Sequence, residues 1–160
     1  MFIFTTGGTI DKIYFDATSE YEIGDPTIPH IFREVGVTVD YELVSLMRKD
    51  SLEISQQDRE QIREKCIECE DSRILITHGT DTMCETAEFL QGIEGKTIVL
   101  TGALQPAAFA HNDAVFNIGC SVAAVQTLSA GTYIVMNGRV FTPDNVVKNR
   151  QENRFEVVTT

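Results

Sequence analysis

The chain has 160 residues, of which 42% are hydrophobic and 23% charged, and this balance predicts one globular domain over residues 1–160. Its 24 acidic residues outnumber 13 basic ones, for a net charge of −11; no basic cluster interrupts that acidity, so nucleic acid and anionic membranes are excluded as expected partners. No apolar run reaches the roughly 18 residues of a membrane span, and no basic leader precedes the first apolar segment, which predicts a cytoplasmic protein.

The first predicted element is a short apolar strand from Met1 to Thr5, which ends at a turn containing Gly7 and Gly8. β-Branched and aromatic residues follow in Thr9 to Phe15, so the turn is expected to lead into an extended or hairpin-like segment. A phosphate-binding glycine turn would instead open a helix, and neither the dinucleotide nor the P-loop motif is present. Nucleotide binding is therefore the less favoured interpretation of this turn.

A polar, turn-rich stretch from Asp16 to Pro29 comes next. Together with the glycine turn it predicts a mobile loop over about residues 6–27, because long loops in compact domains are usually lids or disordered. Tyr21 is the one large polar aromatic residue in this stretch. It either serves the function of the loop or packs at the base of the loop.

The next segment predicts a helix, a strand and a second helix. The helix covers Ile28 to Val35, and the alternating pattern of Val37 to Leu46 is typical of a strand. A polar turn, Met47 to Leu52, follows the strand. Ser55 is then a plausible N-cap for a helix that continues to about Cys69.

Two of the four cysteines, Cys66 and Cys69, have the C-x-x-C spacing found in redox and metal sites. Both fall within a helical pattern, and no second cysteine or histidine pair completes a zinc site. We therefore expect ordinary cysteines that face inward together with Ile62 and Ile67.

Polar residues directly follow the predicted buried strand over Arg73 to Thr77. Open α/β sheets place their ligand sites at the carboxyl ends of such strands. Thr82 and Glu85 match a capping box, so a structural role explains them. Thr80 and Asp81 have no equally simple explanation, and they are candidate functional residues.

His78 lies beside this turn and is a candidate general base, since histidine titrates near neutral pH. A histidine that precedes a glycine at the end of a strand is more often a hydrogen-bonded scaffold residue. We expect this structural role for His78.

Strands and helices continue to alternate along the rest of the chain. The pattern predicts a strand from Lys96 to Thr101, a helix from about Asn112 to Ser129 and a strand from Thr132 to Met136 that begins a hairpin. Lys148 then precedes a polar tail over about residues 149–160. This alternation predicts a three-layer α/β/α fold with a mainly parallel sheet.

Two of the polar turns resemble the signature motifs of bacterial-type L-asparaginases. The first is Thr5 to Ile10, and the second is His78 to Thr82. The similarity continues through Glu20 to Gly24 and Asp50-Ser51, and it reaches Asn145 to Lys148. It therefore covers nearly the whole chain, and both signature motifs are long and ordered.

The resemblance implies a catalytic role for five residues. Thr9 is expected to be the nucleophile that attacks the side-chain amide of L-asparagine, and Tyr21 is expected to orient and activate it. Thr80, Asp81 and Lys148 are expected to form a second hydroxyl–carboxylate–amine set lining the pocket. A threonine hydroxyl needs such neighbours, because it is a weak nucleophile until a base takes its proton.

The resemblance also implies how the substrate is bound. Ser51 and Asp81 are expected to hold its α-carboxylate and α-amino groups respectively, and Asp50, Gly79 and Thr80 complete the expected set. Backbone amides of the glycine turns are candidates to hold the oxyanion. The implied cycle acylates the threonine, releases ammonia and ends with hydrolysis to aspartate, and no metal or organic cofactor is required.

The chain differs from the usual pattern of the family in length. Typical members are about twice as long, and their C-terminal domain completes the active site of a neighbouring subunit. The resemblance therefore implies a short, single-domain form, and we expect a homodimer or larger homo-oligomer.

Leu52 stands where many relatives have a polar substrate contact, which weakens the case for strong glutaminase activity. An amidase for glutamine or another small amide, and a non-catalytic amino-acid sensor, are the alternatives.

Overall fold

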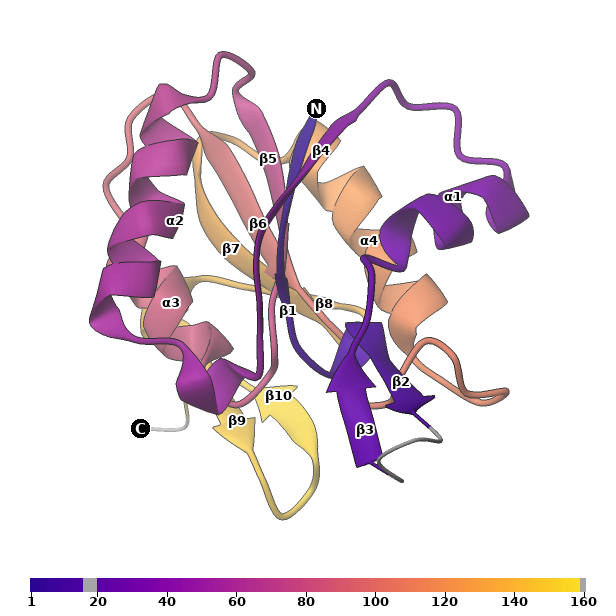
Figure 1. Ribbon diagram of the computed structural model, residues 1–160. Helices are drawn as coiled ribbons and strands as arrows, with labels where there is room; N and C mark the ends of the chain where they lie inside the picture. The colour runs from indigo at the N-terminus through magenta and orange to yellow at the C-terminus, as the bar shows by residue number, and fades with distance from the viewer. Residues whose placement is uncertain (16–19, 159–160) are drawn as a thin grey trace.

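A computed structural model of the chain describes residues 1–15 and 20–158. Six strands form one sheet in the order β4-β1-β5-β6-β7-β8, and four helices pack on its two faces (Figure 1). The strands are β1 (Phe2–Gly7), β4 (Glu42–Lys49), β5 (Arg73–Thr77), β6 (Thr97–Thr101), β7 (Gly131–Met136) and β8 (Arg139–Phe141), and the helices are α1 (Ile28–Val35), α2 (Gln56–Glu68), α3 (Met83–Phe89) and α4 (Ala114–Thr127). All neighbouring strands are parallel except β7 and β8. The predicted three-layer α/β/α fold with a mainly parallel sheet is confirmed.

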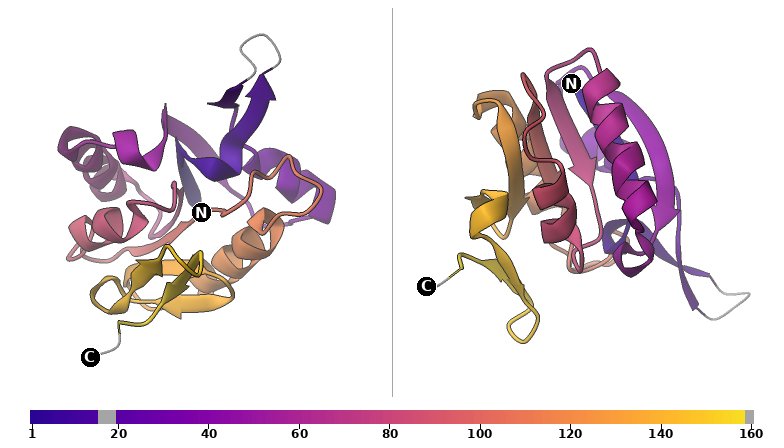
Figure 2. Two further views of the ribbon diagram at one scale, coloured as in Figure 1. Left: turned by 90° about the horizontal axis from the view of Figure 1, so that it is seen from below. Right: turned by 90° about the vertical axis from the view of Figure 1, so that its left-hand side faces the viewer.

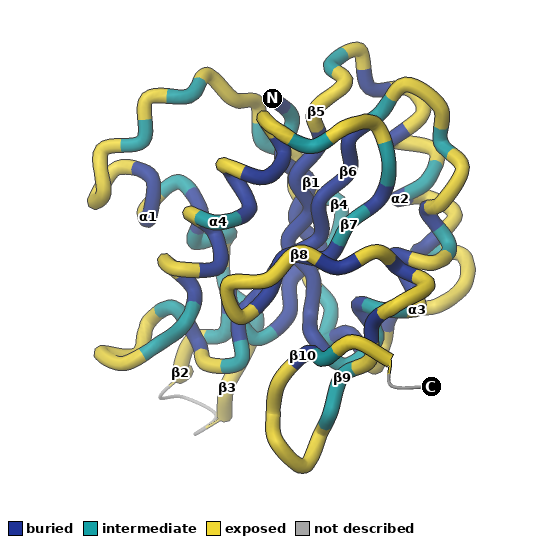
Figure 3. Tube along the Cα trace, turned by 180° about the vertical axis from the view of Figure 1, so that it is seen from behind, coloured by how far each residue is buried: buried dark blue, intermediate teal, exposed yellow. Residues whose placement is uncertain are grey.

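The sheet is buried on both faces. Helices α2 and α3 cover one face and α1 and α4 the other (Figures 1 and 2). Strand β5 shows why its sequence is continuously apolar: Ile74 and Ile76 pack toward α2 and α3, whereas Leu75 packs toward α1 and α4. The strands form the buried centre of the molecule in Figure 3. In the described part of the chain no helix combines the length and apolar character needed to cross a membrane.

The order of the strands fixes where a ligand site can form. The parallel strands, numbered along the chain, lie in the order 2-1-3-4-5, so the order reverses between β1 and β5. In sheets of this kind, the crevice at the carboxyl ends of the two strands beside the reversal is the usual ligand site. The two motif turns follow β1 and β5, so both leave the sheet where such a ligand site is expected.

Two hairpins stand outside the sheet, at the carboxyl ends of its parallel strands (Figure 1). They are β2 (Lys12–Phe15) with β3 (Glu20–Ile23), and β9 (Val147–Asn149) with β10 (Arg154–Glu156); short 3-10 turns are η1 (Thr9–Asp11), η2 (Ser51–Glu53) and η3 (Pro143–Asn145). The hairpin predicted after the first glycine turn is therefore confirmed, and no long helix begins there. Part of the loop predicted as mobile, residues 16–19, lies outside the described residues.

Two regions differ most from the prediction. The strand expected over Val37–Leu46 runs instead over Glu42–Lys49, because the amide of Val37 still closes helix α1 and pairing with β1 starts only where Glu42 bonds to Met1. The polar tail expected over about residues 149–160 contains β10, since Phe155 is only 2% exposed and joins the core. Residues 159–160 lie outside the described residues.

Helix α2 confirms the expectation for its cysteines, with one exception among its neighbours. Cys66 and Cys69 are buried free thiols, and burial raises the pKa of Cys66 to about 12, which makes its thiol unreactive. Ile67 was predicted to face inward but is 56% exposed, because it lies on a different face of the helix from the buried Ile62 and Cys66. Among the described residues, no group of three or more His, Cys, Asp or Glu side chains is placed to hold a metal ion.

Candidate active site

The turns that follow β1 and β5 are in direct backbone contact. A Cβ atom added to Gly8 would lie 2.5 Å from the Cα atom of Gly79, so this close approach requires glycine at position 8. Gly8 also has φ +91°, a conformation that other residues rarely adopt. Thr9 and Thr80 are the next residue in each turn. The fold thus brings the two motifs to one end of the sheet.

The turn η2 packs against the second of these glycine turns. A Cβ atom added to Gly79 would lie 2.6 Å from the Cβ atom of Ser51, so the serine packs directly on the glycine. The amide of Asp81 donates to Ser51 Oγ at 3.2 Å. The hydroxyl of Ser51 accepts this bond and has no acceptor for its own proton among the residues that the structure describes, so that proton can be donated to a ligand.

The capping box expected at the start of α3 does not form. Thr82 occupies the N-cap position, but its side chain makes no capping hydrogen bond. Its hydroxyl instead donates to the carbonyl of Ser51 at 2.7 Å, and Glu85 accepts a bond from Arg59 at 2.9 Å. The physical reason is a tertiary contact, because η2 approaches closely enough to offer the Thr82 hydroxyl a backbone carbonyl as acceptor.

Lys148 joins the second motif from the far end of the chain. Its ammonium group donates to Thr80 Oγ1 at 2.7 Å and to Asp81 Oδ1 at 2.8 Å. The side chains of Lys148 and Asp81 are 12% and 33% exposed. The attraction of the Asp81 carboxylate offsets the desolvation cost of burying the Lys148 ammonium group. Phe155 anchors the β9–β10 hairpin that carries the lysine, and its amide donates to Asn137 Oδ1 at 3.1 Å.

Asp50 lies beside this set but already has partners. Its carboxylate accepts from Lys12 at 2.8 Å and from the amide of Leu52 at 3.2 Å. Partial burial favours the neutral acid, yet Lys12, the Leu52 amide and Lys148 outweigh it and lower the pKa of Asp50. Sequence reasoning missed Lys12, whose partner is distant in the chain.

Thr9 and Tyr21 are not in contact through a hydrogen bond. Thr9 begins η1, is partly buried, and its hydroxyl has no hydrogen-bond partner among the described residues. Tyr21 lies on β3, is 52% exposed, and its ring packs edge-on against Tyr14 and Phe109 at 5.5 and 5.9 Å. The fold therefore places the tyrosine on the hairpin next to the Thr9 turn, with its ring packed against two other aromatic rings.

Asp11 is a structural residue of the site that sequence reasoning missed. Its buried carboxylate accepts from both the amide and the hydroxyl of Thr27, at 2.9 and 2.8 Å, and its carbonyl accepts from the amide of Gly24 at 2.8 Å. Burial raises the pKa of Asp11. The sequence carries only a weak signal for this role, an acid that directly follows Ile10 in a mainly β-branched and aromatic segment.

His78 has the scaffold role that we predicted. It is fully buried, with Nδ1 2.7 Å from the carbonyl of Gly79 and Nε2 2.9 Å from Thr86 Oγ1. A carbonyl can only accept, so Nδ1 carries the proton and Nε2 accepts from the threonine, whose oxygen accepts in turn from Arg59 at 3.2 Å. Burial lowers the pKa of His78 to about 4, and the histidine remains neutral.

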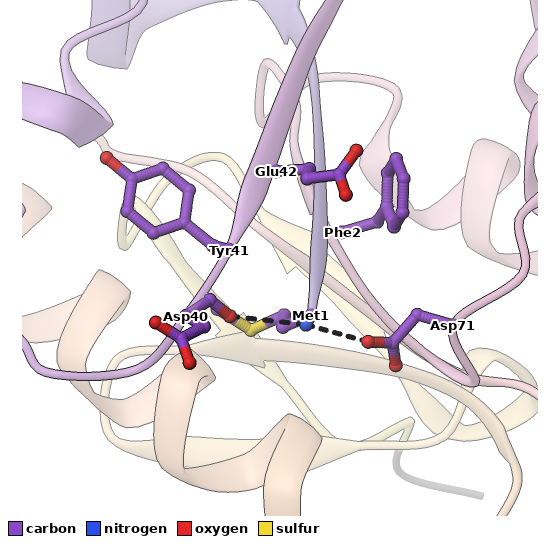
Figure 4. A pocket seen from close by; sticks show the side chains of 6 residues that line it. All are labelled: Met1, Phe2, Asp40, Tyr41, Glu42 and Asp71. Atoms are coloured by element: carbon purple, nitrogen blue, oxygen red, sulfur yellow. Dashed lines mark hydrogen bonds and ion pairs between the residues drawn. The ribbon is translucent and has the colours of Figure 1, made fainter.

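A separate hollow of about 260 Å³ lies at the opposite end of β1 (Figure 4). Its lining residues are Met1, Phe2, Asp40, Tyr41, Glu42 and Asp71. The amino group of Met1 forms an ion pair with Asp71 at 2.7 Å and donates a hydrogen bond to the carbonyl of Asp40 at 3.3 Å. Burial favours the neutral acid of Asp71, but the bond from the amino group is part of what holds its pKa below the usual range. This hollow contains none of the predicted site residues.

Comparison with known proteins gives a match over most of the chain. Residues 1–158 match the family model described as asparaginase, N-terminal. L-asparaginase 2 of Escherichia coli is 31% identical over 172 aligned residues, which cover 98% of this chain and 47% of that protein. A glutaminase-asparaginase of Acinetobacter glutaminasificans is 31% identical over 109 residues, which cover 65% of this chain and 32% of that protein.

Solved structures show the same fold. A thermostable L-asparaginase from Thermococcus kodakarensis superposes with a TM-score of 0.81 at 22% identity, covering 99% of this chain and 51% of that chain. A protein from Campylobacter jejuni described as a probable cytoplasmic L-asparaginase gives a TM-score of 0.81 at 25% identity, covering 98% and 50%. The chain thus spans about half the length of these structures, and a third to a half of the two curated relatives.

Proposed function

The chain belongs to the asparaginase family, and on that premise we propose that it hydrolyses the side-chain amide of L-asparagine to L-aspartate and ammonia, as a step of asparagine catabolism. One observation carries the proposal. The Gly8 and Gly79 turns are in backbone contact, and Lys148 is bonded to both Thr80 and Asp81 beside that contact. A hydroxyl nucleophile, a second hydroxyl, an acid and an amine are thereby available at one end of the sheet.

In the first proposed step, Thr9 Oγ1 attacks the side-chain amide carbon of the substrate. The carbon–nitrogen bond breaks, an ester forms on Thr9, and the hydroxyl proton leaves with the nitrogen as ammonia. Tyr21 is proposed to orient and activate Thr9, since a threonine hydroxyl needs an adjacent group to take its proton. Amides of the glycine turns are proposed to stabilise the oxyanion, as preorganised donors do in acyl transfer.

In the second proposed step, water attacks the ester carbon. The bond to Thr9 breaks, its oxygen recovers a proton, and L-aspartate leaves. The hydroxyl of Thr80 is proposed to pass protons during both steps, with Lys148 polarising it and Asp81 holding the amine in place. The short bonds of Lys148 to these two residues support this role, because proton transfer requires groups within hydrogen-bond distance.

The proposed binding of the substrate matches its two charged groups. Asp81 has a second carboxylate oxygen beyond the one bonded to Lys148, and it is proposed to accept from the α-amino group. Ser51 has a free hydroxyl proton and is proposed to donate to the α-carboxylate. Asp50, Gly79 and Thr80 complete the proposed set, with Asp50 acting mainly through the η2 turn that it caps.

Ammonia release from L-asparagine by the purified chain tests the proposal. Thr9→Ala is expected to lower turnover roughly 100-fold or more, since it removes the nucleophile. Thr38→Ala changes an exposed threonine outside the site and is expected to keep full activity. Equal turnover by the wild type and Thr9→Ala would remove Thr9 from the mechanism. Thermal stabilisation by aspartate without any turnover would instead favour an amino-acid sensor.

Glutamine is a second candidate substrate, favoured by the glutaminase-asparaginase among the relatives. Leu52, an exposed apolar residue directly after Ser51, argues for asparagine over glutamine, because it offers no polar group to the longer substrate. The same assay with both amides separates these candidates. Higher kcat/KM on glutamine would reverse the order that we propose.

We also propose that the protein acts in the cytoplasm as a homodimer or larger homo-oligomer. The description of the Campylobacter neighbour supports the location. The partial exposure of Thr9 and Asp81 supports the assembly, because one side of the proposed site is open to a second copy. Light scattering after size exclusion measures the state, and a monomer with full activity would contradict this proposal.

A further inference from the structure

The loop between β6 and α4 is held by side-chain hydrogen bonds to its backbone. Asp113 accepts from the amide of Leu104 at 3.0 Å. Asn112 donates to the carbonyls of Ala107 and Phe109, at 3.2 and 2.7 Å. Residues 103–110 therefore form a fixed shelf at the start of α4.

This shelf touches the hairpin beside the site at two points. The amide of Ala107 donates to the carbonyl of Ile10 at 3.1 Å, next to Thr9. The ring of Phe109 lies 5.9 Å from the ring of Tyr21 at an interplanar angle of 61°, a favourable edge-to-face arrangement. One contact fixes the base of the hairpin, and the other reaches the side chain of Tyr21.

Among the residues that the structure describes, Phe109 is the aromatic side chain from outside the hairpin that packs against the Tyr21 ring. The other ring partner of Tyr21, Tyr14, is its cross-strand neighbour and belongs to the same hairpin. Pairing with Tyr14 therefore sets the shape of the hairpin but not its position over the sheet. The neighbours of Phe109 on the shelf, Ala107, Ala108 and Ala110, are too short to reach as far.

We infer that Phe109 is a positioning residue, which holds the Tyr21 ring at a fixed place relative to the Thr9 turn. The inference rests on the proposed function, in which Tyr21 activates Thr9. Aromatic pairs of this geometry shift an equilibrium by roughly 2- to 10-fold. Without Phe109, the hydroxyl of Tyr21 spends less time in the position from which it can act, so turnover falls while substrate binding at Ser51 and Asp81 is preserved.

Kinetics of Phe109→Ala test this inference. We expect kcat for ammonia release to fall roughly 3- to 10-fold with little change in KM, and Phe109→Tyr, which keeps the ring, to restore it. Phe116→Ala is the matched control, since it removes a 60% exposed phenylalanine on α4. In a Tyr21→Phe background, Phe109→Ala should have almost no further effect. Wild-type kcat in Phe109→Ala, or the same loss with and without the Tyr21 hydroxyl, overturns the inference.

A measurement of ring contacts separates failure of the inference from failure of the proposed function. We expect a nuclear Overhauser effect between the rings of Phe109 and Tyr21 in the wild type. The Tyr21 signals should shift in Phe109→Ala but not in Phe116→Ala. If the wild type releases no ammonia from any amide, the proposed function fails, and this measurement alone decides the inference. A missing ring contact overturns it whatever the activity.

Discussion

Lys148 is the residue whose placement most strongly links sequence to chemistry. In the sequence it is a lone lysine before a polar stretch, and only the family resemblance assigns it a role. In the fold it donates to a hydroxyl at 2.7 Å and to a carboxylate at 2.8 Å. Those partners lie 68 and 67 positions away in the chain, so no local pattern could have predicted the contact.

We predict that Lys148→Met lowers ammonia release roughly 100-fold or more, because methionine keeps the length of the side chain but has no donor. Stability should fall by only about 1 kcal/mol, since Asp81 is one-third exposed and water can solvate it. Lys65→Met on α2 is the control, because it breaks an exposed ion pair with Glu68. Unchanged turnover in Lys148→Met would exclude the amine from the mechanism.

His78 predicts how stability depends on pH. Its pKa is about 4 in the fold against an ordinary value of 6.5, so the unfolded chain binds more protons between these values. Its contribution is therefore fully present above pH 6.5 and is lost as the pH falls toward 4, by up to about 3 kcal/mol. Urea unfolding of the wild type between pH 7 and about pH 4.5 measures this loss.

His78→Asn is the matched variant, because its side-chain amide can still donate to Gly79 but does not titrate. Its free energy of unfolding should depend less on pH than that of the wild type. Thr38→Ala changes an exposed residue that does not titrate and should leave the pH dependence unaltered. Parallel curves for His78→Asn and the wild type would contradict the assignment of a buried neutral imidazole.

The elements themselves were largely predictable, because hydrophobic periodicity is a local property. The strands predicted at Arg73–Thr77 and at Thr132–Met136 match the fold closely, and so does the helix at Ile28–Val35. Two of the errors arose where a distant partner decides the outcome. The capping box at Thr82 failed because η2 supplies another acceptor, and the expected tail holds a strand because Phe155 reaches the core.

The hairpin beside the site gives a prediction at the scale of an element. Asp11→Ala removes the acceptor of two bonds from Thr27, so hydrogen exchange at the Thr27 amide should accelerate about 10-fold or more. The free energy of unfolding of the whole protein should change less than the local protection of the Thr27 amide. The reason is that the raised pKa of the buried Asp11 carboxylate reflects an unfavourable burial of its charge. Asp11→Asn keeps an acceptor oxygen and should retain most of the protection. Equal exchange in all three proteins would show that Asp11 does not fix the hairpin.

At the scale of the whole molecule, the site follows from the order of the strands. The sequence predicted that polar turns end several strands, but not that β1 and β5 are neighbours, since pairing is a long-range property. That adjacency places Gly8 against Gly79 and makes one site from two motifs. The chain spans about half the length of the related structures, and a second copy of the chain is proposed to close the open side of the site.

A crystal structure of the protein soaked with L-aspartate is the most direct test of the central claim, that the two motif turns form one amide-hydrolysing site. We predict aspartate bound at the crevice between β1 and β5, with its side-chain carboxyl group beside Thr9 Oγ1. Its α-amino group should lie on Asp81 and its α-carboxylate on Ser51. Aspartate bound away from these turns, or turned so that its α-carboxylate faces Thr9, would contradict the account.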